Sequence, residues 1–300
     1  MRGPFHIYLL AVILFFSVIT NGQQPKIVVF QSDFGVKDGA VSAMKGVAMG
    51  VSNDLKLYDL THEIPAYNIW EASYRLMQTV PYWPTGTVFV SVVDPGVGTT
   101  RKSVVVKTKS GQYIVTPDNG TLTLIAESIG IENVREIDEA VNRRKDSEKS
   151  YTFHGRDVYA YTGARLASGT ITYEQVGKAL PDSVVMIPYQ HATINGAVIK
   201  GNIPVLDIQY GNVWTNIGGD LFNQLHLKNG DTLQVAIFHN NKKVYQGKMP
   251  YAQTFGEVSK GKPLAYLNSL LQVSFALNQS SFANVYHVSS GSEWSVEIKK

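Results

Sequence analysis

One predicted strand of this chain ends in a carboxylate and breaks at once into a glycine-rich turn. Thr87–Ser91 is a β-branched and aromatic run that predicts a buried strand, and Val92-Val93-Asp94-Pro95-Gly96-Val97-Gly98 follows it. Such an ending places Asp94 at the carboxyl edge of a sheet, where open α/β sheets bind their ligands. The glycines let the loop fold back and bring Arg101 toward Asp94. A tight turn with a solvated Asp–Arg pair is the alternative reading of this segment.

The same pattern recurs along the first half of the chain. The segment Lys26–Gly35 reads as a strand that ends in Asp followed by Gly, at Ser32-Asp33-Phe34-Gly35, and Leu55–His62 reads as a third strand, which closes on polar groups. Residues 38–47 and 68–80 between and after them carry apolar residues at helical spacing. Strand–helix alternation with polar strand ends predicts an α/β N-terminal domain over residues 25–188, with a central, mostly parallel sheet.

The pattern of the sequence changes after Pro181. Short alternating strands separated by turn signals such as Asn195-Gly196 and Lys228-Asn229-Gly230-Asp231 follow, and Thr232–Ile237 alternates with period two. These features predict a small β-barrel or sandwich, and we expect an all-β barrel as the C-terminal domain, over residues 196–300.

The N-terminal segment has the features of an export signal. Arg2 and His6 precede the apolar run Ile7–Ile19, and small residues follow it, which predicts a signal peptide over residues 1–22. The run is short for a bilayer span of about 20 residues, so an uncleaved anchor is the weaker alternative. We therefore expect an exported protein, periplasmic or secreted, with no membrane association after cleavage. Without cysteine, no disulfide can support its core.

Charge gives no sign of a nucleic-acid partner. The formal net charge of the 300 residues is +3, and loss of Arg2 leaves +2. The basic cluster Arg143-Arg144-Lys145 lies in a polar segment, and we expect it to be a solvated loop.

Motifs spread over the whole chain resemble those of one enzyme family. They are Ser32-Asp33-Phe34-Gly35, Asp59-Leu60-Thr61-His62, Val93-Asp94-Pro95-Gly96-Val97-Gly98, Pro117-Asp118-Asn119-Gly120, Phe153-His154-Gly155-Arg156-Asp157, Gly211-Asn212-Val213-Trp214-Thr215-Asn216 and Leu267-Asn268-Ser269. In this order they resemble the S-adenosyl-L-methionine (SAM) hydrolases, also called SAM hydroxide adenosyltransferases, which are relatives of the SAM-dependent fluorinase and chlorinase.

The resemblance implies hydrolysis of SAM to adenosine and methionine by a water that attacks C5′, with no cofactor and no metal. It assigns the water-orienting role to Asp94, Arg101 and His154. The substrate-binding residues that it implies are Asp33 for the ribose diol, Tyr67 for the ribose side, Asp207 for the methionine ammonium, Ser269 for its carboxylate, and Asn212, Tyr210 and Phe255 for adenine. It also implies a homotrimer with sites between subunits.

The chemistry is consistent with these residue types. A sulfonium leaves without protonation, so the reaction needs chiefly a water held in line with C5′ and polarised. Asp94 can accept a hydrogen bond from that water, and the vicinal hydroxyls of ribose suit a carboxylate such as Asp33.

Two departures from the halogenases favour water over halide. The halogenases carry a tyrosine where Asp94 stands, and they have a long insertion that is missing between Ser103 and Asn119 here. Leu270 stands where the fluorinase has an arginine, which leaves one charge fewer for the methionine carboxylate.

Other readings remain open from sequence. The chain could be an exported binding protein for adenosine or SAM without turnover, or less plausibly a SAM-dependent 5′-halogenase. A metal-dependent hydrolase would use acidic and histidine side chains at strand ends, namely Asp33, Asp59, His62, Asp94 and Asp118. We expect His62 to be a structural residue.

Overall fold

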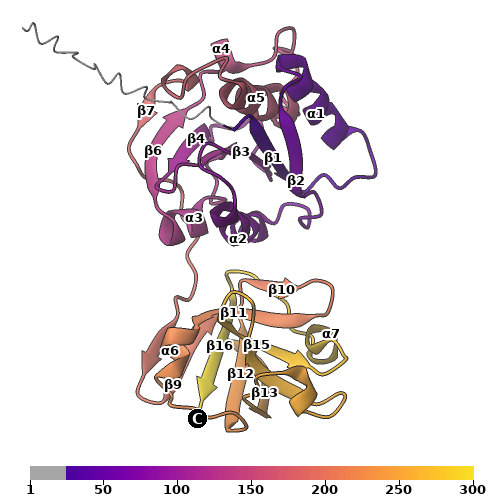
Figure 1. Cartoon of the computed structure of the whole chain (residues 1–300), viewed down its shortest axis with the longest axis vertical. Helices are drawn as coiled ribbons and strands as arrows, with labels where there is room; N and C mark the ends of the chain where they lie inside the picture. The colour runs from indigo at the N-terminus through magenta and orange to yellow at the C-terminus, as the bar shows by residue number, and fades with distance from the viewer. Residues whose placement is uncertain (1–24) are drawn as a thin grey trace, which may run out of the picture.

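The computed structural model describes residues 25–300, and the predicted signal peptide lies outside this range. The first half builds one seven-stranded sheet in the order β2-β1-β3-β5-β4-β6-β7 (Figure 1). Its elements are β1 (Ile27–Ser32), α1 (Ala40–Val51), β2 (Lys56–Thr61), α2 (Ile69–Thr79), η1 (Val80–Tyr82), β3 (Val88–Val92), β4 (Ser103–Thr108), β5 (Tyr113–Pro117), α3 (Thr123–Ser128), β6 (Ile131–Glu136), α4 (Glu139–Asn142), the π-helix η2 (Gly155–Ala160), α5 (Tyr161–Ser168), η3 (Glu174–Val176) and β7 (Ala179–Leu180).

The sheet is mixed, with one dominant strand direction. β1 runs parallel to β2 and β3, and β3 runs parallel to β5. β4 is antiparallel to β5 and β6, and β6 is antiparallel to β7. Five strands of the seven (β1, β2, β3, β5 and β6) therefore point the same way. The predicted α/β class is confirmed.

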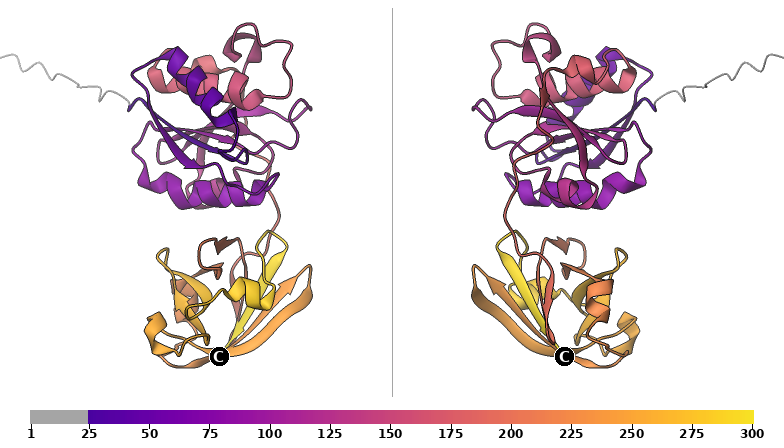
Figure 2. Two further views of the ribbon diagram at one scale, coloured as in Figure 1. Left: turned by 90° about the vertical axis from the view of Figure 1, so that its right-hand side faces the viewer. Right: turned by 90° about the vertical axis from the view of Figure 1, so that its left-hand side faces the viewer.

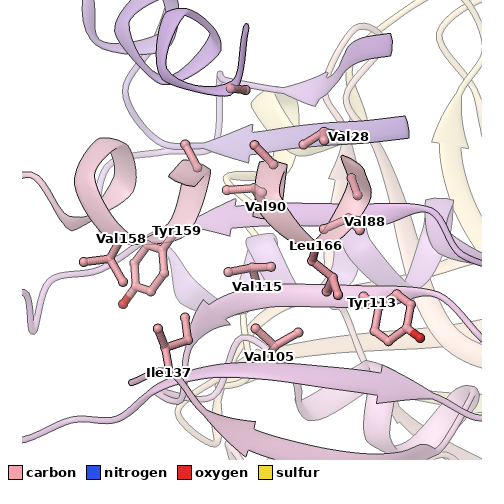
Figure 3. Packing of buried hydrophobic residues seen from close by; sticks show 14 of the residues in the cluster. Val28, Val88, Val90, Val105, Tyr113, Val115, Ile137, Val158, Tyr159 and Leu166 are labelled. Atoms are coloured by element: carbon pink, nitrogen blue, oxygen red, sulfur yellow. The ribbon is translucent and has the colours of Figure 1, made fainter. Parts of the chain in front are cut away.

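Helices cover both faces of this sheet, so its central strands are apolar on both sides. Along β3, Val88, Val90 and Val92 face a core shared with α1 and α5, whereas Phe89 faces a second core shared with α2 and α3. Figure 3 shows the first of these cores, in which residues from η2 and α5, such as Tyr159 and Leu166, lie over the valines of the strands.

The second half consists of two antiparallel sheets, ordered β10-β11-β15-β14 and β13-β12-β16-β9-β8. Its elements are β8 (Thr193–Asn195), β9 (Val198–Asn202), β10 (Val205–Asp207), β11 (Asn212–Gly218), α6 (Gly219–Asn223), β12 (Thr232–His239), β13 (Lys242–Pro250), η4 (Phe255–Glu257), β14 (Pro263–Leu267), β15 (Gln272–Leu277), α7 (Phe282–Tyr286) and β16 (Trp294–Lys299).

One apolar core lies between these two sheets. The alternation predicted along β12 is present, because Leu233, Val235 and Ile237 are buried in this core. A bridge between Tyr251 and Ala265 links the end of β13 to β14, so the two sheets meet at that edge in a barrel-like manner. The predicted all-β C-terminal part is confirmed.

The two halves meet through α2. Trp70 Nε1 donates to the carbonyl of Pro204 at 3.1 Å, and Tyr74 OH donates to Gln272 Oε1 at 3.4 Å. Trp70, Tyr74 and Val205 share a small buried cluster. Figures 1 and 2 show α2 and α3 on the side of the first half that faces the β-sheets, with the C-terminus at the far end. In the described part of the chain, no helix has the length and apolar character needed to cross a bilayer.

Candidate active site

The candidate site lies at the ends of β1 and β3, where the strand order continues to opposite sides of β1. β1 has β2 on one side and β3 on the other, so the chain leaves β1 toward one edge and later continues on the opposite side. Ser32 and Val92, the last residues of β1 and β3, are register partners. Asp33 and Asp94 therefore follow from neighbouring strand ends, at the kind of position where open α/β sheets bind ligands.

Asp94 and Arg101 form a closed, bidentate ion pair. Arg101 Nε donates to Asp94 Oδ1 at 2.9 Å and Arg101 Nη2 donates to Asp94 Oδ2 at 2.6 Å. The two side chains are only 5% and 11% exposed, so the alternative of a solvated pair is wrong. Arg101 Nη1 donates to Ser103 Oγ at 2.9 Å, and Tyr159 OH donates to Asp94 Oδ2 at 3.4 Å.

Hydrogen bonds and neighbouring charges shift the pKa values of Arg101 and Tyr159. Burial works against the Arg101 cation, but the hydrogen bond and charge of Asp94 outweigh it, so the pKa of Arg101 is raised. Burial also raises the pKa of the Tyr159 hydroxyl, and the Asp94 charge adds to this effect. Tyr159 therefore stays a neutral hydrogen-bond donor toward the carboxylate.

His154 lies immediately before η2 and is buried. Its Nε2 is 3.2 Å from Arg143 Nη2, while its Nδ1 is buried without a hydrogen-bond partner in the described part of the chain. Burial lowers the pKa of His154, and the Arg101 and Arg143 charges act in the same direction against Glu139 and Asp94. An unpaired buried ring nitrogen is uncommon in a purely structural histidine, which argues for a function.

A cavity of about 270 Å³ brings part of the predicted site together. Four of the predicted residues line it, namely Asp33, Tyr67, Asp94 and His154. Phe34 and Phe153 add apolar walls, with their rings edge to face at a centroid distance of 5.8 Å. The cavity thus combines a fixed carboxylate, an imidazole and aromatic surface.

Two glycines permit the close approach of the segments around this cavity. A Cβ on Gly155 would lie 3.2 Å from both Phe34 Cε2 and Val92 Cγ1, so η2 starts in close contact with the ends of β1 and β3. Gly98 has a φ of +76°, and a Cβ there would lie 3.4 Å from the Tyr151 carbonyl. Gly155 thus allows η2 to start close to the ends of β1 and β3, and Gly98 allows the left-handed turn that brings the Asp94 loop against Tyr151.

Asp33 has a structural contact as well as a place in the cavity. Its Oδ2 accepts a hydrogen bond from the Tyr67 backbone N–H at 2.9 Å. Tyr67 has a φ of +68°, a left-handed conformation that costs free energy for a residue with a side chain. The Tyr67 ring is 73% exposed, so it stands at the rim of the cavity.

The remaining predicted residues lie on the C-terminal half. A cavity of about 770 Å³ is lined by Asp207, Tyr210, Asn212 and Phe255. Asn212 Nδ2 donates to Asp207 Oδ2 at 3.2 Å, so part of its amide is already engaged. This cavity shares no lining residue with the one at Asp94.

Ser269 lies apart from both of these cavities. Together with Leu270 it lines a cavity of about 540 Å³ between the two halves, which Arg75 and Ile208 also line. Within one chain, the predicted binding residues are therefore distributed over separate hollows.

The other strand-end residues have structural partners. Asp59 Oδ1 accepts from His62 Nε2 at 3.0 Å, and His62 Nδ1 in turn accepts from the Ser32 hydroxyl at 2.7 Å. Burial opposes the Asp59 charge, but hydrogen bonds from Lys45 and His62 lower its pKa overall. Asp118 accepts from the Val185 backbone N–H at 2.8 Å. Among residues 25–300, no three His, Cys, Asp or Glu side chains lie close enough together to hold a metal ion.

Sequence reasoning missed several neighbours of the site. Tyr159 in η2 and Ser103 at the start of β4 each form a hydrogen bond with the Asp94–Arg101 pair. Apart from these positions, nothing in the sequence marks either residue. The segment Arg143-Arg144-Lys145 is a loop, as expected, and Lys145 is exposed, but the expectation that the whole cluster is solvated is wrong for Arg143, whose side chain is only 10% exposed. Arg143 is held by Glu139 and His154, and Arg144 Nε donates to the fully buried Asp157 at 2.9 Å.

Comparison with solved structures supports the class of fold. A structure from Thermotoga maritima, described only as an uncharacterized conserved protein, matches with a TM-score of 0.81 at 34% identity, over 91% of this chain and 100% of that one. A conserved hypothetical protein from Thermus thermophilus matches with a TM-score of 0.67 at 28% identity, over 91% of this chain and 98% of the other.

Sequence comparison identifies the family. The SAM hydroxide adenosyltransferase N-terminal domain matches residues 28–177, and the C-terminal domain of the same family matches residues 201–295. This chain therefore belongs to the SAM hydroxide adenosyltransferase family, as the motifs indicated.

Two relatives have names that state different activities, a hydrolase and a fluorinase. An (R)-S-adenosyl-L-methionine hydrolase from Methanocaldococcus jannaschii is 36% identical over 86% of this chain and 92% of that protein. A fluorinase from Actinopolyspora mzabensis is 28% identical over 88% of this chain and 95% of its own length.

Proposed function

We propose that this enzyme hydrolyses SAM to adenosine and L-methionine, by attack of water on C5′ of the adenosyl group. The observation that supports this most directly is the cavity that Asp33, Asp94 and His154 line together, with Asp94 held by two hydrogen bonds from Arg101. The named hydrolases among its relatives support the same substrate.

In the proposed mechanism, Asp94 orients the attacking water. Arg101 engages both of its oxygens from one side, which fixes the carboxylate plane and leaves lone pairs for a water proton. The bond from the water oxygen to C5′ forms as the C5′–S bond breaks. Its electron pair goes to sulfur, so the sulfonium becomes the neutral thioether of methionine, and one water proton is released through Asp94.

In the proposed mechanism, His154 is an uncharged group beside the substrate. Its lowered pKa keeps the imidazole neutral at neutral pH, so it does not repel the cationic sulfonium. Asp33 would bind the ribose diol and Tyr67 would cover that side of the sugar. Together these contacts would hold C5′ in line with the water, which is the main requirement of this displacement.

Hydrolysis fits this site better than halogenation. A carboxylate that is 5% exposed beside the nucleophile position would repel a halide ion, whereas it can accept a hydrogen bond from water. The turn between β4 and β5 is short, as the sequence predicts. The pairing of Lys107 with Tyr113 in the hairpin shows this. No halogenase-like insertion interrupts it.

We also propose a homotrimer in which each active site joins two chains. The Asp94 cavity has no methionine-binding or adenine-binding residue of the predicted set, and the 770 Å³ cavity has no water-orienting one. A head-to-tail ring would place the first cavity of one chain against the second cavity of its neighbour. Asp207 would then bind the methionine ammonium, and Asn212, Tyr210 and Phe255 the adenine, whereas Ser269 lines neither of the two joined cavities.

Export, with the signal at residues 1–22 removed, remains part of the proposal. SAM is made inside cells, so an exported enzyme would act on SAM, or a related adenosyl compound, that reaches the exterior. No cofactor or metal takes part in the proposed reaction, since the sulfonium is itself the activated group.

The decisive assay incubates the purified mature protein with SAM and separates the products. Adenosine and methionine in equal amounts are expected, and EDTA should leave the rate unchanged. Tight binding of SAM without product would instead support the binding-protein reading. Loss of activity in EDTA with recovery on adding a divalent metal would support a metal-dependent hydrolase.

A further inference from the structure

Arg143 is directed at the catalytic histidine rather than at solvent. Its side chain is 10% exposed, and its Nη2 lies 2.5 Å from Glu139 Oε2 and 3.2 Å from His154 Nε2. Its Nη1 donates to the Ser150 carbonyl at 3.2 Å. The guanidinium is thus fixed by α4 on one side and by the segment before η2 on the other.

The contact between Arg143 and His154 determines which ring nitrogen carries the proton. A guanidinium can only donate, so Nε2 of His154 must be the acceptor in this 3.2 Å hydrogen bond. Glu139 Oε2 is 3.7 Å from the same nitrogen, which is too far for a hydrogen bond from an Nε2–H. The proton of the neutral ring therefore belongs on Nδ1.

Among residues 25–300, no group forms a hydrogen bond with Nδ1. This nitrogen is buried, while the residue lines the cavity that Asp33 and Asp94 also line. An Nδ1–H is then the one donor of the ring that is not already engaged, and it is available to an occupant of the cavity, such as the attacking water, that reaches it.

From this geometry we propose that Arg143 is a positioning residue, which holds His154 as the neutral Nδ1–H tautomer so that its proton points to the substrate water. This assignment rests on the proposed hydrolysis for its catalytic meaning, but the tautomer itself does not depend on activity. Glu139 would act indirectly, because it fixes Arg143.

The charges around His154 agree with a neutral ring. Arg143 and Arg101 disfavour protonation, whereas Glu139 from α4 and Asp94 from the loop after β3 favour it. Tyr159 of η2, with its ring centroid 6.4 Å away, is an uncharged neighbour. Removal of the Arg143 charge would leave Glu139 without its partner, so the pKa of His154 should rise.

The direct test is nitrogen NMR of the protein labelled with ¹⁵N-histidine, without SAM, with the His154 signals assigned by their loss in His154→Gln. In the wild type, the unprotonated ring nitrogen should couple to both ring carbon protons, which identifies it as Nε2. Arg143→Met should lose this pattern, whereas Arg143→Lys, which keeps a cationic donor, should largely retain it.

Kinetics give a second readout. Arg143→Met should lower kcat for SAM by about tenfold with little change in KM, and should move the acid limb of the pH profile upward. Arg144→Met is the matched control, because Arg144 anchors the same segment on Asp157 without touching His154. It should keep the wild-type tautomer and acid limb.

The outcomes separate this inference from the function on which it rests. A wild-type His154 protonated at Nε2, or an unchanged tautomer in Arg143→Met, would overturn the role of Arg143 whatever the activity. The same losses in Arg144→Met would also overturn it, by showing that order of the segment is what matters. The predicted tautomer in a protein that does not turn over SAM would contradict the proposed function alone.

Discussion

At the scale of single residues, the proposed catalysis depends on two polar side chains that are fixed before any substrate arrives. Asp94 is held by two hydrogen bonds from Arg101, and His154 by one from Arg143. Groups that are already in place need no reorganisation when the reaction occurs, which is where enzymes gain much of their rate. The residue types alone would not provide this.

Asp94→Asn should abolish hydrolysis and leave adenosine binding nearly intact. The amide keeps the shape and can still accept from Arg101, but it lacks the charge that polarises the water. The rate should fall on the order of 10²–10⁴-fold, the range for a positioned proton acceptor. Asp118→Asn, at the end of β5, is the control and should stay active. An equal loss of adenosine affinity would show that Asp94 binds or folds instead.

The pH dependence should report the lowered pKa of His154. Burial and the neighbouring arginines oppose its charged form, so the active, neutral ring persists below the usual histidine pKa of 6.5. Activity should therefore fall only when the pH drops through a value below 6.5. Profiles of kcat/KM against pH for wild type and His154→Gln would check this. A histidine-dependent limb above 6.5 would contradict it.

At the scale of elements, the sequence reveals the strand ends better than the segment that closes the site. The buried strands that lead to Asp33 and Asp94 are readable because burial and strand termination are local signals, whereas Asp59 lies within β2, which has no buried residue. The segment around Arg143 is not, since a run of charged residues in a polar stretch normally indicates solvent. The burial of Arg143 and the pairing of Arg144 depend on His154 and Asp157, which are partners that only the folded chain brings near.

The close start of η2 gives a prediction about Gly155. A Cβ there would lie 3.2 Å from Phe34 and Val92 and 3.3 Å from Met44 Sδ, so Gly155→Ala should overpack the junction. We expect a loss of about 1–3 kcal/mol in the free energy of unfolding, with weaker SAM binding. Gly46→Ala in α1, where a Cβ meets nothing within 4 Å, is the matched control and should not destabilise. Urea unfolding and SAM titration would measure both, and equal stability of the two variants would refute the packing argument.

At the scale of the whole molecule, the predicted site divides between two halves of the chain. The fold class of each half follows from periodicity, and the structure bears it out. The partition into separate cavities could not be read from sequence, because it depends on how the halves pack through α2. That partition is the reason to expect sites completed by a second chain.

Complementation between inactive variants tests this expectation. Asp94→Asn and Asp207→Ala damage different half-sites, so mixed refolding should restore about a quarter of the interfaces in a random closed ring. Each variant refolded alone should stay inactive. If wild type survives the treatment while the mixture shows no recovery, each site is formed within one chain and the ring is wrong.

The central claim is attack of water on C5′, and the fate of isotopic oxygen tests it most directly. Hydrolysis of SAM by the mature enzyme in H₂¹⁸O, followed by mass spectrometry, should give adenosine with one ¹⁸O atom at its 5′ oxygen and methionine without label. Methionine or a fragment of it carrying the ¹⁸O, or a 5′-halo-adenosine formed in added chloride or fluoride, would contradict the account.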